Sequence, residues 1–177
     1  MKARIAVLLA IVTGTAAFAA TAPAAPADPS AANATIVGVA AGDKRFSTLV
    51  ALVQQAGLVK TLNGKGPFTV FAPTNAAFAK LKKAAPETYE AVTTDNALLT
   101  KVLTYHVLGA RVPSTAAVAV AKKNGSVKTV EGEKIKLSLK ANNLFINGNA
   151  RVIIPDVKTS NGIIHALNNV LVPPSLS

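Results

Sequence analysis

The interval between apolar residues changes once along the chain, and this change constrains the fold more than any other feature. Between residues 46 and 56 the apolar side chains recur at helical intervals, which is typical of an amphipathic helix. Between residues 134 and 140 polar and apolar residues alternate without interruption, as in a strand with one solvent-exposed face. Asn-Gly pairs at 147–148 and 161–162 then separate further β-rich runs, as tight hairpin turns do. The chain is therefore predicted to be an α+β domain with helices first and antiparallel strands later.

Helix start and stop residues divide the first half of this domain. The first helix is expected to begin with Asp43 as its N-cap and to stop at Gly57. A short strand at 69–72 follows it. Thr74 is expected to cap the next helix, and Asn75 to tie this turn to a neighbouring segment.

A third helix is predicted to begin near Asp95. Its apolar stripe runs from Leu98 to Leu103 and continues into Tyr105 and His106 at helical spacing. Both of these side chains are therefore expected to face the interior. There the tyrosine ring would fill space and the imidazole would satisfy a backbone group.

The N-terminus has the pattern of a secretory signal peptide. Lys2 and Arg4 precede the apolar run 5–12, and small residues end at Ala19. We predict a signal peptide at residues 1–19, cleaved after Ala19, and a disordered Ala/Pro-rich spacer at 20–33. The apolar run is too short for a transmembrane helix of about 20 residues. The product is expected to be secreted or periplasmic, without a transmembrane anchor, and monomeric.

Few residues could support catalysis or metal binding. The chain has no cysteine, which excludes disulfides, thiolate metal sites and a cysteine nucleophile. His106 and His165 are its only histidines, and no known metal-ligand spacing includes them. We therefore expect neutral, hydrogen-bonded histidines, no metal and no cofactor.

An enzyme is also disfavoured. The chain has no Gly-x-Ser-x-Gly motif and no serine beside a histidine. Glu87 with Glu90, and Glu131 with Glu133, are the closest carboxylate pairs, and both lie in polar stretches where we expect them to be solvated. No residues are therefore assigned to catalysis.

The net charge favours an anionic partner. The formal charge is +11, and removal of Lys2 and Arg4 with the signal peptide leaves +9. Arginines are few, and no basic stripe alternates with stacking aromatic residues, so nucleic-acid recognition is not expected. The lysines are scattered along the sequence. An anionic polysaccharide or the cell-envelope surface is the expected partner, besides a protein.

Three separated segments resemble the signatures of the fasciclin domain family. They are Gly66–Phe78, which contains Thr-Val-Phe-Ala-Pro-Thr-Asn, then Val102–Leu108 with its Tyr-His pair, and finally Asn161–Pro173. The resemblance covers residues 34–174 and leaves 175–177 as a tail. The signature positions are Thr69, Phe71, Pro73, Thr74, Asn75, Phe78, Gly162, His165 and Asn168. Asn168 stands where the family usually has an acidic residue, so a charged partner is missing there.

The resemblance implies both a fold and a function. The implied fold is a compact wedge of two small β-sheets with helices packed along one edge. The implied function is that of a non-enzymatic adhesion or interaction module at the cell surface, with Tyr105 and His106 as candidate binding residues. The alternative is a carrier of an apolar ligand such as a carotenoid. Exposed, contiguous aliphatic side chains on helix 98–107 or on a loop at 112–120 would favour that alternative.

Overall fold

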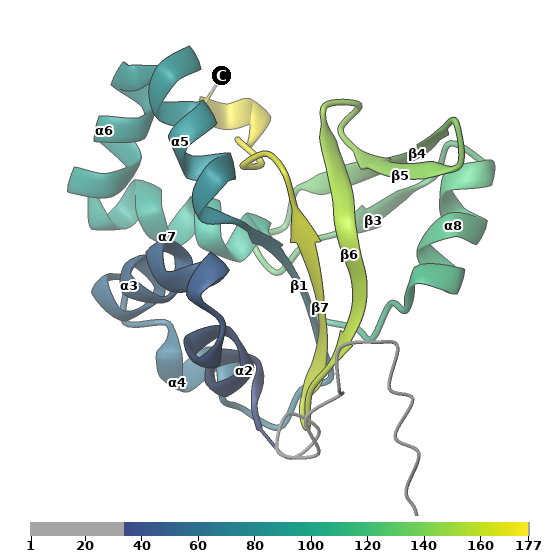
Figure 1. Cartoon of the computed structure of the whole chain (residues 1–177), viewed down its shortest axis with the longest axis horizontal. Coiled ribbons are helices and arrows are strands. Elements are labelled where there is room, and N and C mark those ends of the chain that lie inside the picture. Colours follow the sequence, from purple (N-terminus) through teal and green to yellow (C-terminus); the bar gives the residue numbers. More distant parts are fainter. Residues whose placement is uncertain (1–33, 177) are drawn as a thin grey trace, which may run out of the picture.

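The computed structural model describes residues 34–176, in which helices and a twisted sheet pack together (Figure 1). The predicted signal peptide (1–19) and the whole predicted spacer (20–33) lie outside the described residues. Among residues 34–176, no helix is long and apolar enough to cross a lipid bilayer.

The first helices cover one side of the sheet. They are α2 (Ile36–Gly42), the 3-10 helix η1 (Lys44–Phe46), α3 (Ser47–Gln55) and α4 (Val59–Leu62). The sequence predicted one helix from Asp43, but the chain turns there. The Asp43 side chain accepts a hydrogen bond from the Arg45 N–H and caps η1, and α3 begins only at Ser47. Gly57 has φ +69°, so it ends this region as predicted.

Four more helices follow along the chain. They are α5 (Asn75–Ala84), α6 (Pro86–Thr94), α7 (Asn96–Tyr105) and α8 (Ser114–Lys122). Asp95 caps α7 as predicted, because its carboxylate accepts hydrogen bonds from two N–H groups in the first turn. Helices α6 and α8 were not predicted. The region expected to form a loop at 112–120 is largely α8.

Seven strands form a mixed sheet in the order β2-β1-β7-β6-β5-β4-β3. Their bounds are β1 (Phe68–Pro73), β2 (Val107–Leu108), β3 (Ser126–Lys128), β4 (Lys134–Lys140), β5 (Asn143–Ile146), β6 (Ala150–Lys158) and β7 (Gly162–Leu167). The predicted pair of small sheets is not confirmed, since each strand is hydrogen-bonded to the next in one continuous order. The α+β class agrees with the prediction. Helices α2–α7 pack together as predicted, but α8 packs on the other core.

Two interior strands of the sheet pair in parallel, which the sequence did not predict. β1 and β7 pair in parallel over their whole lengths, from Phe68 opposite Gly162 to Pro73 opposite Leu167. Both strands are buried on both faces, so neither shows the polar alternation of β4. The Asn-Gly turns at 147–148 and 161–162 connect antiparallel neighbours as predicted.

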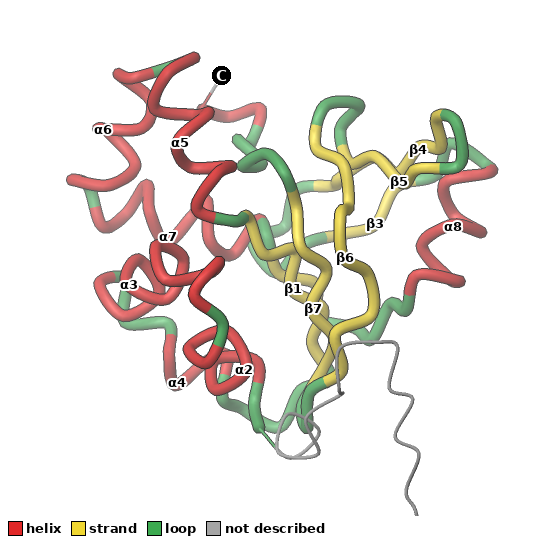
Figure 2. Tube along the Cα trace, viewed as in Figure 1, coloured by secondary structure: helices red, strands yellow, loops and turns green. Residues whose placement is uncertain are grey.

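Helices α2–α7 lie on one side of the β1–β7 pair and α8 on the other (Figure 2). An apolar core fills each side. Alternation along β1 sends Val70 and Ala72 into the core under α2–α7, and Phe71 into the core beneath α8. Helix α7 contributes to both cores, with Leu103 in the first and Tyr105 in the second. The end of α7 is therefore the point where the two cores meet.

Candidate functional site

His106 is buried at the end of α7, with 2% of its surface exposed. Its Nδ1 lies 2.7 Å from the Val102 carbonyl oxygen, and its Nε2 accepts the N–H of Leu171 at 2.9 Å. A carbonyl oxygen can only accept, so Nδ1 carries the ring proton. The main-chain oxygen of His106 also accepts from the Phe71 N–H. One residue therefore joins α7, β1 and the C-terminal segment.

These contacts hold the His106 imidazole in its neutral form. Burial lowers the pKa of His106 to about 4, although the hydrogen bond to Val102 acts in the opposite direction. Both ring nitrogens already serve backbone groups. The ring is therefore a structural cross-link at neutral pH and has no nitrogen left for an external ligand.

Tyr105 points into the other core, and its ring is fully buried. Its hydroxyl oxygen accepts a hydrogen bond from the Asn147 amide at 2.9 Å. Burial raises the pKa of Tyr105, and the nearby Glu133 and Glu131 charges also raise it, whereas the Asn147 bond lowers it. Tyr105 also borders an open cleft of about 580 Å³ between β4 and the C-terminal segment. The prediction that Tyr105 and His106 face inward is confirmed.

His165 lies on β7, and its two ring nitrogens have the reverse donor and acceptor roles of those in His106. Its Nε2 donates to the Val112 carbonyl oxygen at 2.9 Å, and its Nδ1 accepts the Asp156 N–H at 3.2 Å. The ring stacks on Phe71, with 5.5 Å between centroids. Burial lowers the pKa of His165, while the Val112 bond and the Asp156 charge raise it to a smaller extent. The expectation of neutral, hydrogen-bonded histidines holds for the geometry of both.

Two polar side chains position the segment between β2 and α8. Thr69 donates to the Ala110 carbonyl oxygen at 2.7 Å and accepts the Val112 N–H at 2.8 Å. The Asp156 carboxylate accepts from both the N–H and the hydroxyl of Ser114 at the start of α8. Burial raises the pKa of Asp156, but these hydrogen bonds and the nearby His165 and Lys158 charges together lower it further, so the net pKa is lowered. The start of α8 is thereby fixed to β1 and β6.

The turn after β1 is only partly as predicted. Thr74 occupies the N-cap position of α5, but its side chain makes no cap bond and donates instead to the Leu167 carbonyl oxygen at 3.3 Å. Asn75 does tie the turn to a neighbour. It accepts the Thr48 N–H and donates to the Lys44 carbonyl oxygen and to the Ser47 hydroxyl. Pro73 ends β1 and Phe78 packs in the first core.

Gly162 lies where two backbones approach closely. A Cβ atom at this position would lie 2.1 Å from the Phe68 carbonyl oxygen, so only glycine fits beside β1. The preceding Asn161 is 8% exposed and makes several hydrogen bonds, which sequence reasoning missed. The Asn-Gly turn pattern marked its position but not its partners. The same is true of Asn147, the partner of Tyr105.

Asn168 fills the acceptor role at its position without a charge. Its side-chain oxygen accepts the Arg151 N–H at 2.9 Å, and its own N–H donates to the Arg151 carbonyl oxygen. An amide oxygen is sufficient for this contact.

The two carboxylate pairs differ in their exposure to solvent. Glu87 and Glu90 are exposed on α6, as expected. Glu131 and Glu133 are only half-exposed, which corrects the prediction that both pairs are solvated. Glu131 lies 3.8 Å from Lys101, and one carboxylate oxygen of Glu133 is buried without a hydrogen-bond partner among the described residues. Within residues 34–176, no group of three His, Asp or Glu side chains gathers to hold a metal ion.

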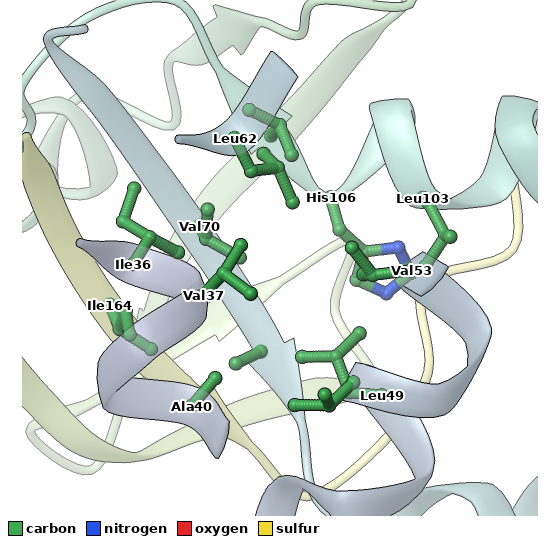
Figure 3. A pocket seen from close by; sticks show the side chains of 13 residues that line it. Ile36, Val37, Ala40, Leu49, Val53, Leu62, Val70, Leu103, His106 and Ile164 are labelled. Atoms are coloured by element: carbon green, nitrogen blue, oxygen red, sulfur yellow. The ribbon is translucent and has the colours of Figure 1, made fainter. Parts of the chain in front are cut away.

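The apolar cavity beneath α2 and α3 is small. It measures about 20 Å³ and is lined by aliphatic side chains together with His106 (Figure 3). The large apolar side chains that are exposed in residues 34–176 are Val130 and Ile153, and neither lies on α7 or α8. A polyene needs a far longer apolar groove. The features that would favour an apolar carrier are therefore not found in the described part of the chain.

Comparison with known proteins decides the family. A family model described as the fasciclin domain matches residues 44–173. The chain belongs to the fasciclin domain family. The resemblance of the three signature segments is thereby confirmed, and all three lie within this fasciclin domain.

Relatives of this fasciclin domain occur in bacteria, and its fold recurs in an insect protein. Protein sll1483 of Synechocystis is 43% identical over 140 residues, which cover 79% of this chain and 74% of that protein. The cell surface glycolipoprotein MPB83 of Mycobacterium bovis is 33% identical over 145 residues, which cover 79% of this chain and 61% of the relative. A FAS1 domain pair from the insect cell adhesion molecule fasciclin I superposes with a TM-score of 0.71 at 20% identity. That alignment covers 82% of this chain and 53% of the other.

Proposed function

We propose that this protein is an exported, non-enzymatic interaction module that attaches to a protein or an anionic polysaccharide of the cell envelope. The observation that carries the proposal is the match of residues 44–173 to the fasciclin domain. The relative MPB83 is named as a cell surface protein, and the insect neighbour as a cell adhesion molecule. The predicted cleavage after Ala19 would place this chain outside the cytoplasm as well.

The geometry of the two histidines disfavours catalysis by either imidazole. Each imidazole accepts one backbone N–H and donates to one backbone carbonyl, so neither nitrogen is free to move a substrate proton. Of the Tyr-His pair, Tyr105 is fully buried, and its hydroxyl holds the Asn147 amide at the wall of the open cleft. We assign Tyr105 a role in partner binding through Asn147, and His106 a positioning role.

The test is capture of envelope material on the immobilised protein at about 50 mM and about 500 mM salt. We expect specific capture that weakens at the higher salt concentration, because the chain is strongly cationic and charge attraction is screened. Tyr105→Phe keeps the ring in the core and removes only the hydroxyl, so we expect weaker capture with an unchanged fold. Failure of the wild-type protein to retain any envelope component would contradict the proposed function.

A further inference from the structure

The alternating pattern of β4 places several lysines on one face of the sheet. Ile135 and Leu137 are buried in the second core, so the residues that alternate with them along the strand point to the opposite side. Those residues are Lys134, Lys136, Ser138 and Lys140. Every position on this side of the strand is therefore a lysine or a serine.

Neighbouring strands add charge to the same side. Lys128 on β3 lies directly opposite Lys134. Phe145 on β5 is paired with Ser138 on one side and with Arg151 of β6 on the other, so Arg151 shares this face too. We call these residues the cationic face: Lys128, Lys134, Lys136, Lys140 and Arg151. All five are exposed, although they are spread over 24 positions of the sequence.

Within residues 34–176, no acidic side chain forms an ion pair with the cationic face. The ion pairs within residues 34–176 are Arg45 with Asp43 and Lys101 with Glu131. Glu133 precedes β4, but one of its carboxylate oxygens is buried. Like charges placed opposite each other across two strands destabilise a sheet. The cluster therefore does not serve folding, and an external anion would relieve its repulsion.

The cationic face adjoins a cleft with hydrogen-bonding walls. The cleft, of about 580 Å³, has a size typical of small-molecule sites, which run from about 300 to about 1,000 Å³. Its lining includes Lys134, Lys136 and Ser138 from β4, together with Asn124 and Asn147, and the buried Tyr105 holds the Asn147 amide. Lysines thus lie beside residues with amide and hydroxyl groups. This combination suits a ligand that carries both carboxylates and hydroxyl groups.

We infer that the cationic face and the adjoining cleft bind an acidic polysaccharide, with sugar hydroxyls in the cleft and carboxylates on Lys134 and Lys136. This inference rests on the proposed function and gives it a surface and a ligand class. A nucleic acid fits less well, because Arg151 is the single arginine and Phe145 the single aromatic side chain of the strand face. A membrane surface fits less well too, because exposed large apolar side chains in residues 34–176 are limited to Val130 and Ile153.

The experiment compares two double variants with equal loss of charge. Lys134→Gln with Lys136→Gln removes the centre of the cationic face, and Lys80→Gln with Lys83→Gln removes two exposed lysines from α5. The full-length chain is titrated by calorimetry at about 50 mM salt with polygalacturonate, a linear polymer of uronic acid, and with neutral dextran. Vesicles containing phosphatidylglycerol test the lipid alternative. Thermal unfolding checks that all variants are folded.

We expect polygalacturonate to bind the wild-type protein and dextran not to bind. The β4 variant should raise the Kd about tenfold, and the α5 variant less than about twofold. Equal losses in both variants would overturn the inference, because general charge attraction would then explain binding. Binding to vesicles through the β4 lysines without binding to polygalacturonate would also overturn it. If the β4 variant still captures envelope material like the wild type, the site is wrong while the proposed function stands.

Discussion

Buried polar residues of this protein stabilise the fold through hydrogen bonds to backbone groups of distant segments. His106 and His165 each bridge backbone groups from distant segments, and they use opposite tautomers because Val102 and Val112 offer acceptors to different ring nitrogens. A lysine or arginine could not accept the Leu171 N–H, and an apolar residue would leave that group unpaired. Neutral imidazole satisfies a donor and an acceptor at once.

The buried His106 makes the stability of the fold depend on pH. In the unfolded chain an ordinary histidine binds a proton near pH 6.5, whereas folded His106 stays neutral until about pH 4. Between these values the unfolded state holds more protons, so stability is lost as the pH falls through this window. We expect the free energy of unfolding to fall by up to about 3 kcal/mol between pH 7 and pH 4 from this residue alone. Urea unfolding at several pH values measures the loss.

Nuclear magnetic resonance can follow the titration of each histidine separately. Burial lowers the pKa of His165 as well, so its titration adds to the same loss of stability. The ring resonances of His106 should remain those of the Nδ1–H tautomer at pH 5 and above. A titration midpoint of His106 near pH 6.5 would contradict the assignment of a buried neutral ring.

At the scale of elements, strand pairing depends on a few close approaches. β1 and β7 run in parallel in the interior of the sheet, where Gly162 faces the carbonyl oxygen of Phe68. At the sheet edge the contacts are less favourable, since Lys128 faces Lys134. The β1–β7 pair is therefore closely packed, whereas the facing lysines of β3 and β4 lower the stability of the sheet edge.

Gly162→Ala should disrupt the pairing of β1 with β7. Its Cβ would overlap the Phe68 carbonyl oxygen at 2.1 Å and approach Ile36 at 2.9 Å, so β1 and β7 would have to separate. We expect a loss of more than about 3 kcal/mol in the free energy of unfolding. Gly42→Ala is the matched control, because a Cβ there meets nothing within 4 Å. Equal midpoints of denaturant unfolding for the two variants would disprove the role of the close approach.

Lys134→Glu should stabilise the sheet edge while weakening anion binding. The new carboxylate would face Lys128 across the β3–β4 pair, and opposite charges at such positions contribute about 0.2–1 kcal/mol. We expect a small rise in the thermal midpoint together with a loss of binding to polygalacturonate. Lys134→Gln, which removes the repulsion without adding attraction, should lie between the wild type and Lys134→Glu in stability. A fall in stability for Lys134→Glu would show that the repulsion is not present.

At the scale of the whole molecule, Asn161 joins three segments that are far apart in the sequence. Its side-chain oxygen accepts the Ile36 N–H at 3.0 Å, where α2 begins. Its amide donates to the Leu62 and Gly64 carbonyl oxygens at 2.6 and 2.9 Å. The β6–β7 turn is thereby joined to the first helix and to the segment that leads into β1.

Replacement of Asn161 should therefore destabilise the whole domain rather than one turn. Asn161→Ala leaves buried backbone groups unpaired, and we expect a loss of about 2–4 kcal/mol in the free energy of unfolding. Asn169→Ala serves as the control. Asn169 makes one exposed bond to the Asn149 carbonyl oxygen and should cost less than about 1 kcal/mol. Hydrogen exchange should show faster opening of α2 in Asn161→Ala, and unchanged protection there would contradict this role.

The sequence by itself determined the features that depend on near neighbours. Strand β4, the Asn-Gly turns, the Asp95 cap and the inward direction of Tyr105 and His106 all follow from periodicity or turn chemistry within a few residues. The signature segments also identified the family correctly.

Only the tertiary structure decided which distant segments meet. The parallel pairing of β1 with β7 joins strands about 90 positions apart, and buried apolar runs carry no information about their partner. The hydrogen bonds of Asn161 and of both histidines reach across similar separations. The lysines looked scattered because their common face depends on the register of four strands, and register is fixed by which side chains the two cores bury.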